Sequence, residues 1–299
     1  MSEPFCSVLS LEASEPLAGT AAGDTDRYLV LEHDGTWGPK GVEDSGLPEV
    51  LVTHLQALGQ RHPRLRVQLV RRPQRGVGEP LRVYFAETGE EPALYATRLD
   101  HVEQLTELEL DGWLRGATAA PGDREREPLY LVCSHGKRDR CCALLGLPVQ
   151  RALSERVGDR CLQTTHLGGH RFAATLLTLP HGLCYGRVQA EEAEALVEAT
   201  ERGDIHDLSR VRGRSAYSSE AQAAEIMLRE RLGELRIAAL SLRAVERLDT
   251  KRYRVRFVGD MGVEHTVELE REPLPAMPQS CGAQPKPGSR LIRVPSAPA

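Results

Sequence analysis

Two pairs of residues in the middle of the chain have the types and the spacing of metal ligands. Cys133 and Cys142 are separated by eight residues, and His166 and His170 by three, two of which are glycines. Thiolates are soft, anionic donors that suit iron–sulfur clusters and zinc, and neutral imidazole nitrogen binds the same metals without adding charge. Glycines allow positive φ and let the backbone come close to a bound group. These four residues therefore predict a metal site.

Spacing alone leaves the partner of Cys133 open. Cys141 precedes Cys142 and would be separated from Cys133 by seven residues instead of eight. His135 suits a hydrogen bond beside the ligands, or a role in capping the loop after Cys133, better than direct ligation. Free cysteine is among the most often buried residue types. We therefore expect a structural role for the cysteines that lack a partner pattern: Cys6, Cys161, Cys184 and Cys281.

The predicted elements place both pairs where a strand gives way to a loop. Residues 129–132 are a continuous apolar run typical of a buried strand, which ends at Cys133. A helix is predicted over 142–157, and a strand over 162–165 leads to His166. A hairpin and another helix follow, and this order is that of a thioredoxin-like fold. Loops after neighbouring parallel strands meet at one edge of a sheet, so the two pairs can converge there.

The whole sequence predicts an α/β fold in three parts. Residues 1–118 alternate strand-like and helix-like stretches and predict an N-terminal α/β domain. A polar segment punctuated by proline leads into the thioredoxin-like domain over 119–234. Residues 235–299 change to alternating strands, a β-rich extension with a tail rich in proline and glycine. We expect the tail after Pro273 to lie over the surface or to be partly disordered.

Composition excludes several classes of function. The 299 residues carry a net charge of −5, which argues against a general nucleic-acid-binding protein. No run approaches 18 apolar residues, so we expect no transmembrane helix and no membrane partner. The start of the sequence lacks the features of a signal peptide, and a cytoplasmic location is expected. The seven cysteines then indicate metal ligands, redox groups or small buried residues rather than a disulfide framework.

Several stretches resemble the sucrase/ferredoxin-like family. This family includes the Apd1-type proteins, whose C-terminal part is a thioredoxin-like ferredoxin. The specific part of the resemblance is the stretch LVCSHGKRDRCC over 131–142 together with HLGGHRFA over 166–173. Shorter matches, which extend the resemblance over most of residues 5–235, lie at 15–20, 185–188 and 212–215.

The resemblance implies a [2Fe–2S] cluster bound by Cys133, Cys142, His166 and His170. The family's C-x8-C pair falls on Cys133 and Cys142, which favours Cys142 over Cys141. In ordinary thioredoxin-like ferredoxins the second pair is C-x3-C, whereas both positions are histidine in this chain. Imidazoles in place of thiolates on one iron make such a cluster less negative and easier to reduce. Their free ring nitrogens can gain or lose protons, so we expect a reduction potential that depends on pH.

The sequence therefore favours an electron-transfer protein over an enzyme that turns over a substrate, and no catalytic residue is predicted. Its electron donor, its acceptor and its oligomeric state are not specified by the sequence. A structural zinc protein is the alternative, because two cysteines and two histidines also satisfy tetrahedral zinc. A thiol–disulfide oxidoreductase on a thioredoxin-like fold is less favoured, because the chain has no C-x-x-C motif.

Overall fold

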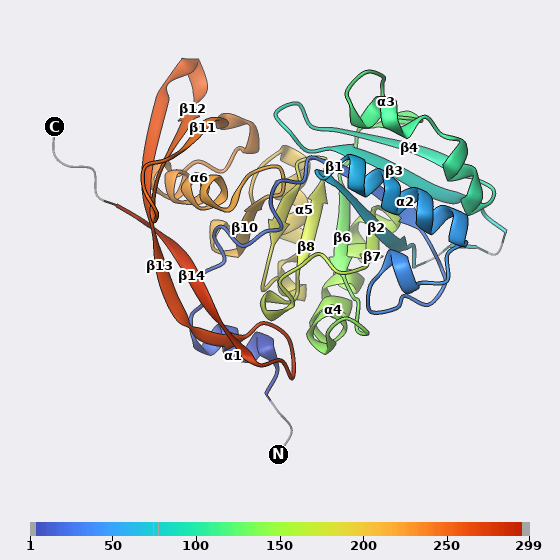
Figure 1. Cartoon of the computed structure of the whole chain (residues 1–299), viewed down its shortest axis with the longest axis horizontal. Coiled ribbons are helices and arrows are strands. Elements are labelled where there is room, and N and C mark those ends of the chain that lie inside the picture. The colour runs from blue at the N-terminus through green and yellow to red at the C-terminus, as the bar shows by residue number, and fades with distance from the viewer. Residues whose placement is uncertain (1–3, 74, 77, 295–299) are drawn as a thin grey trace.

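A computed structural model describes residues 4–73, 75–76 and 78–294 of the chain and confirms the predicted α/β class. A ten-stranded mixed sheet forms the centre, and a four-stranded antiparallel sheet lies beside it (Figure 1). In the described part of the chain, no helix combines the length and the apolar character that a membrane crossing needs.

The first half of the central sheet comes from the N-terminal part of the chain. Its strands are β1 (Arg27–Glu32), β2 (Leu65–Arg71), β3 (Leu81–Glu87), β4 (Ala93–Leu99) and β5 (Asp123–Glu125). Strand β1 runs parallel to β2 and antiparallel to β3. Helix α2 (Glu49–Arg61) buries Leu51, Leu55 and Leu58, which recur at helical spacing on one face. Strands β1 to β4 and α2 share one hydrophobic core, to which the short helix α3 (Leu110–Leu114) also contributes.

The second half contains the predicted strand, helix, strand, hairpin and helix in the predicted order, and adds the strand β10, which the sequence did not predict. Its order is β10-β9-β8-β6-β7, with β6 parallel to β7 and antiparallel to β8. Its elements are β6 (Leu129–Cys133), α4 (Arg140–Val157), β7 (Cys161–Thr164), β8 (Leu176–Leu179), β9 (Leu183–Tyr185), α5 (Ala193–Arg202) and β10 (Val211–Arg214). Every residue of β6 is buried, because alternate side chains enter cores on opposite faces of the sheet.

Helix α4 packs unusually close to the end of β6. A β-carbon on Gly146 would collide with the backbone carbonyl of Cys133, so glycine is needed for this approach. The helix begins at Arg140, two residues before the predicted start, where the Asp139 side chain accepts the Cys141 N–H. It continues through Pro148 without an interruption. The start and the packing of α4 together fix the position of Cys142 relative to Cys133.

The two halves predicted as separate domains share this one sheet. Strands β2 and β7 pair antiparallel at Val70 and Thr164, and Thr164 and Thr165 both donate hydrogen bonds to the Gln68 side chain. Strand β5 lies beyond the predicted boundary at 118 yet pairs with β4 of the first half. The N-terminal half therefore reaches the segment that leads to His166.

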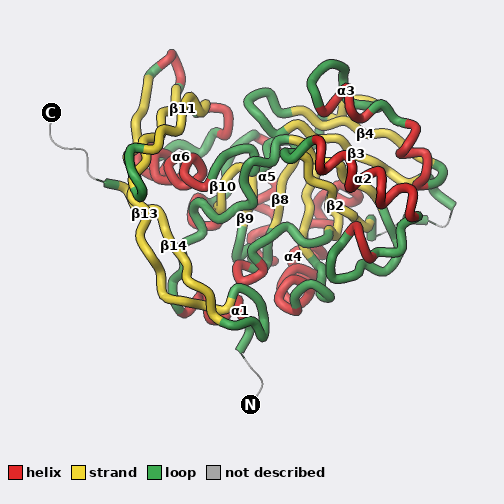
Figure 2. The backbone as a smooth tube through the Cα atoms, in the orientation of Figure 1, coloured by secondary structure: helices red, strands yellow, loops and turns green. Residues whose placement is uncertain are grey.

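The C-terminal region is more ordered than the sequence suggested. Helix α6 (Ser219–Leu232) packs against a sheet of β11 (Ser241–Arg247), β12 (Arg252–Val258), β13 (Glu264–Pro278) and β14 (Pro285–Arg293). Of the two alternatives expected for the tail after Pro273, disorder is wrong as far as Arg293, because β13 and β14 pair as a long ribbon. Most residues of this ribbon are exposed or half-buried, which agrees with a tail that lies over the surface. Figure 2 shows this ribbon running from the small sheet to the N-terminal helix α1 (Cys6–Glu12), whose contact with β13 the sequence did not predict.

Candidate functional site

Three of the four predicted ligands lie together at the carboxyl ends of two parallel strands. Cys133 is the last residue of β6, Cys142 lies in the first turn of α4, and His166 follows β7. One donor atom from each, two sulfurs and one ring nitrogen, lies within 4.8 Å of the other two. Both cysteines are buried and His166 is partly exposed. The group therefore has an interior side formed by sulfur and an outer side formed by nitrogen.

His170 lies beside His166. The two ring centroids are 4.9 Å apart and the rings are tilted by 31°. The Nδ1 atoms of both rings are buried without a hydrogen-bond partner among the described residues. Buried polar atoms are almost always paired, so an orphaned nitrogen on His166, which meets the two thiols, and another on the neighbouring His170 fit a bound metal centre, although His170 lies outside the group of three. The donor set of two thiols and two imidazoles suits iron–sulfur and zinc chemistry alike.

The two thiols are strongly coupled. The hydrogen bond from Cys142 lowers the pKa of Cys133 well below its usual value, and the neighbouring His166 acts in the same direction. The thiolate of Cys133 in turn raises the pKa of Cys142, as does burial. The coupling thus makes loss of one proton from the pair easier and loss of the second harder. A bound cation would favour loss of the second proton, because thiolates are the form that binds metals.

Two arginines from distant strands hold the histidine loop. Arg66 of β2 donates a hydrogen bond of 2.8 Å to the His166 carbonyl. Arg212 of β10 is buried and donates to the Gly168 carbonyl at 2.9 Å and to Thr20. Burial lowers the pKa of Arg212 to about 10, which leaves it charged at neutral pH. The predicted glycine conformation is confirmed here, since Gly168 and Gly169 have φ of 91° and 70°.

Comparison with known proteins shows to which family the chain is related. The family model described as sucrase/ferredoxin-like matches residues 17–213. The chain belongs to this family. It is also 29% identical over 97 residues to altered inheritance of mitochondria protein 32 of Meyerozyma guilliermondii, a match that covers 29% of this chain and 34% of that protein. The chain thus spans about a third of the length of this curated relative. No solved structure matches the chain.

In this sucrase/ferredoxin-like chain, His135 makes a hydrogen bond, as predicted, but with a distant segment and not as a cap of its own loop. Its Nε2 lies 2.9 Å from the Gly38 carbonyl oxygen, and its ring meets Trp37 edge-on at 5.9 Å. The Arg71 guanidinium lies over the Trp37 ring, 4.1 Å from its centroid. His135 is therefore tied to the segment after β1. It packs beside the Cys133 group without belonging to it.

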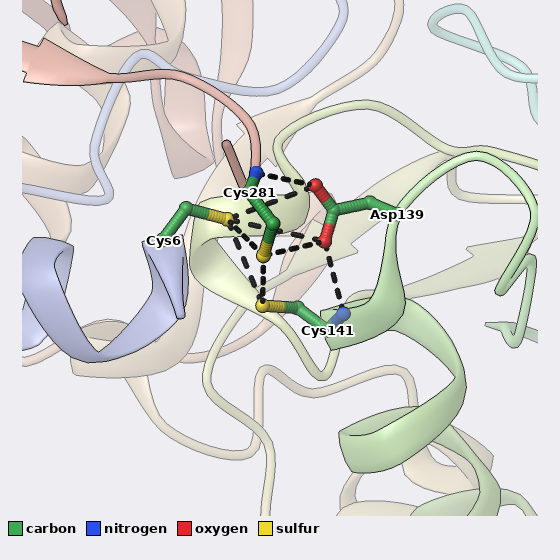
Figure 3. A group of neighbouring side chains, drawn as sticks. All are labelled: Cys6, Asp139, Cys141 and Cys281. Carbon is green, nitrogen blue, oxygen red and sulfur yellow. Dashed lines mark hydrogen bonds between the residues drawn. The ribbon is translucent and has the colours of Figure 1, made fainter. Parts of the chain in front are cut away.

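Cys141 points away from Cys133 and joins a second group. Figure 3 shows its sulfur facing Cys6, Cys281 and the carboxylate of Asp139. The structure therefore brings Cys142 next to Cys133 and leaves Cys141 elsewhere. Sequence reasoning assigned Cys6 and Cys281 no partner. No local spacing could have connected them, because they are 135 and 140 residues away from Cys141.

Proposed function

We propose that the protein binds one [2Fe–2S] cluster through Cys133, Cys142, His166 and His170 and acts as an electron carrier. The observation that carries this proposal is the convergence of two thiols and His166 within 4.8 Å at the carboxyl ends of β6 and β7. The unpartnered Nδ1 atoms of the two histidines support it further. Membership of the sucrase/ferredoxin-like family agrees with it. We also propose that the chain is a thioredoxin-like ferredoxin of the Apd1 type, as the resemblance implies.

The chain would supply binding, orientation and shielding. A bound cluster supplies reversible one-electron oxidation and reduction. Cys133, Cys142 and His170 are at most 8% exposed and keep water from the sulfur side. Arg66 and Arg212 hold the histidine loop by its carbonyl groups. Fixed ligands limit the structural change that accompanies a change of charge, which suits electron transfer.

Electrons would enter and leave through the histidine side. A hollow of about 470 Å³ opens beside His166 and is lined by Arg66, Arg138 and Lys40. These cations favour an acidic surface on the donor or the acceptor. The seven free cysteines suit a reducing compartment, so a cytoplasmic location is part of the same proposal.

Metal analysis and spectroscopy of anaerobically purified protein test the proposal. We expect about two irons and two acid-labile sulfides per chain, a red-brown colour, and an EPR signal on one-electron reduction. Cys133→Ser should remove the colour, whereas Cys184→Ser should not, because Cys184 is a buried cysteine outside both groups. Protein that binds zinc at Cys133 and contains neither iron nor sulfide would contradict the cluster and favour the zinc alternative. Fully titratable free thiols without any metal would favour the oxidoreductase.

A further inference from the structure

A second set of metal-binding side chains lies on the opposite side of the start of α4. It consists of Cys6 from α1, Asp139 and Cys141 from the start of α4, and Cys281 from the turn between β13 and β14 (Figure 3). One donor atom from each residue lies within 4.8 Å of the other three. Three segments that are distant in the sequence thus contribute one set of donors.

The three sulfurs form a nearly equilateral triangle. The Cys6–Cys141, Cys6–Cys281 and Cys141–Cys281 sulfur distances are 3.6, 3.7 and 3.4 Å. Bonded disulfide sulfurs would be about 2.05 Å apart. Around a tetrahedral zinc ion with bonds of about 2.3 Å, neighbouring sulfurs lie about 3.8 Å apart. The triangle therefore has nearly the edge length that one zinc ion requires.

The Asp139 carboxylate lies beside the three sulfurs and can supply the fourth ligand of a tetrahedral zinc ion. Its Oδ1 lies 3.2 Å from the Cys281 sulfur, and its two oxygens lie 4.0 and 3.9 Å from the Cys6 sulfur. The carboxylate is held in place by the backbone N–H groups of Cys141 and Cys281, each at 2.9 Å, and by the Ser280 hydroxyl at 2.8 Å. Hydrogen bonds of this kind orient the ligands of metal sites. His170 Nε2 lies 3.8 Å from Asp139 Oδ2, between the two groups.

The surroundings favour anionic ligands and offer few apolar contacts between the segments. The group lies at the N-terminus of α4, where the helix dipole stabilises negative charge. Ser7 Oγ lies 3.3 Å from the Cys141 sulfur and can donate to it. Among the residues that the structure describes, the apolar cluster at this place consists of Cys6, Cys141 and Ala173, with Phe5 and Cys281 beside it. Hydrophobic burial alone therefore holds α1 and the β13–β14 turn only weakly.

We propose that Cys6, Cys141, Cys281 and Asp139 bind a structural zinc ion. Three thiolates and one carboxylate satisfy tetrahedral zinc without an open position, which is the pattern of structural rather than catalytic sites. Each thiol releases its proton to solvent as its sulfur binds the ion, and no electron is transferred. Cys6 and Cys281 lie outside the residues matched by the family model, so this site would not be shared by every member.

Zinc content in a matched set of full-length variants tests the proposal independently of the cluster. We expect about one zinc per wild-type chain after growth with added zinc, and X-ray absorption with three sulfur ligands and one oxygen ligand. Cys281→Ser and Cys6→Ser should lower the zinc content at least several-fold and leave iron and the visible spectrum unchanged. Cys133→Ser should do the reverse, and Cys184→Ser should change neither metal.

A second measurement covers variants that fail to fold. In the wild-type protein, zinc should protect Cys6, Cys141 and Cys281 from alkylation, and a zinc chelator should remove that protection. Zinc that persists in Cys281→Ser but is lost in Cys133→Ser would overturn the proposal, because the ion would then occupy the first group. A wild-type chain without zinc that contains a disulfide between two of these cysteines would also overturn it.

Discussion

Cys141 and Cys142 are adjacent in the chain, but their side chains join different groups. Successive residues of an α-helix point about 100° apart, so a helix that begins just before them directs them to different sides. The Asp139 cap fixes that beginning by accepting the Cys141 N–H at 2.9 Å. The same carboxylate lies in the second group, so Asp139 both starts the helix and lines the site that Cys141 enters.

Replacing both His166 and His170 by cysteine tests the role of the histidines in the proposed cluster. Thiolates add negative charge, so the reduction potential should fall by on the order of 200 mV or more. Its dependence on pH between about 6 and 10 should disappear, because cysteine ligands have no free ring nitrogen to titrate. A redox titration followed by visible absorption measures both effects. A pH dependence that persists in the double variant would show that another group titrates.

At the scale of elements, the second group joins α1 and the β13–β14 ribbon to the start of α4. Each contributes few apolar contacts at that point, and the three cysteines make up most of the local apolar cluster. A bound ion would replace hydrophobic burial as the main cross-link between the two ends of the described chain. The ion would then tie the turn between β13 and β14, where Cys281 lies, to the start of α4.

Hydrogen exchange tests this cross-link. Removing zinc with a chelator should raise amide exchange at least several-fold in α1 and around the β13–β14 turn. Without the ion, local opening of these segments no longer requires metal–ligand bonds to break. Exchange in α2 and β1, which belong to a different hydrophobic core, should stay unchanged and serves as the internal control. Equal exchange with and without the chelator in all these segments would contradict a structural role for the ion.

At the scale of the whole molecule, the central sheet makes the first group depend on both halves of the chain. Arg66 reaches the His166 carbonyl from β2, and Arg212 reaches the same loop from β10. His181 lies in the turn between β8 and β9 and lines a hollow together with Leu94 and Arg124 of the first half. Burial there lowers the pKa of His181 to about 4, and the charge of Arg214 adds to this effect.

This histidine should make the fold sensitive to acid. Because the pKa of His181 is lower in the folded chain than its ordinary value of 6.5, the unfolded chain binds the proton more readily. The contribution of the neutral His181 side chain to stability is therefore complete above pH 6.5. This contribution, on the order of 3 kcal/mol in total, is lost as the pH falls towards 4. His181→Gln should therefore lose less stability than wild type between pH 7 and about 4.5 in thermal unfolding.

His101→Gln provides the matched control, since His101 is an exposed histidine in another loop. This variant should follow the wild-type pH profile. If His181→Gln and wild type lose stability in parallel as the pH falls, then His181 is not the group responsible.

Much of the fold followed from local patterns. The apolar run before Cys133, the helical spacing of Leu51, Leu55 and Leu58, and the strand that precedes His166 each occupy one short window of sequence. The α/β class was predictable for that reason. The pairing of β2 with β7 was not predictable, because no sequence pattern around Val70 or Thr164 indicates that the two residues pair. The ordered structure of the tail was not predictable either, since proline and glycine are compatible with both an irregular segment and an edge ribbon.

The sequence by itself narrowed the first group to Cys133, either Cys141 or Cys142, His166 and His170, because spacing and strand ends are local properties. Only the tertiary structure decided that Cys142, and not Cys141, lies beside Cys133, because that choice depends on where α4 begins and how closely Gly146 lets it pack. It alone brought Cys6 and Cys281 to Cys141. Their meeting depends on how the two ends of the described chain fold back onto α4, and long-range packing of this kind leaves no local pattern in the sequence.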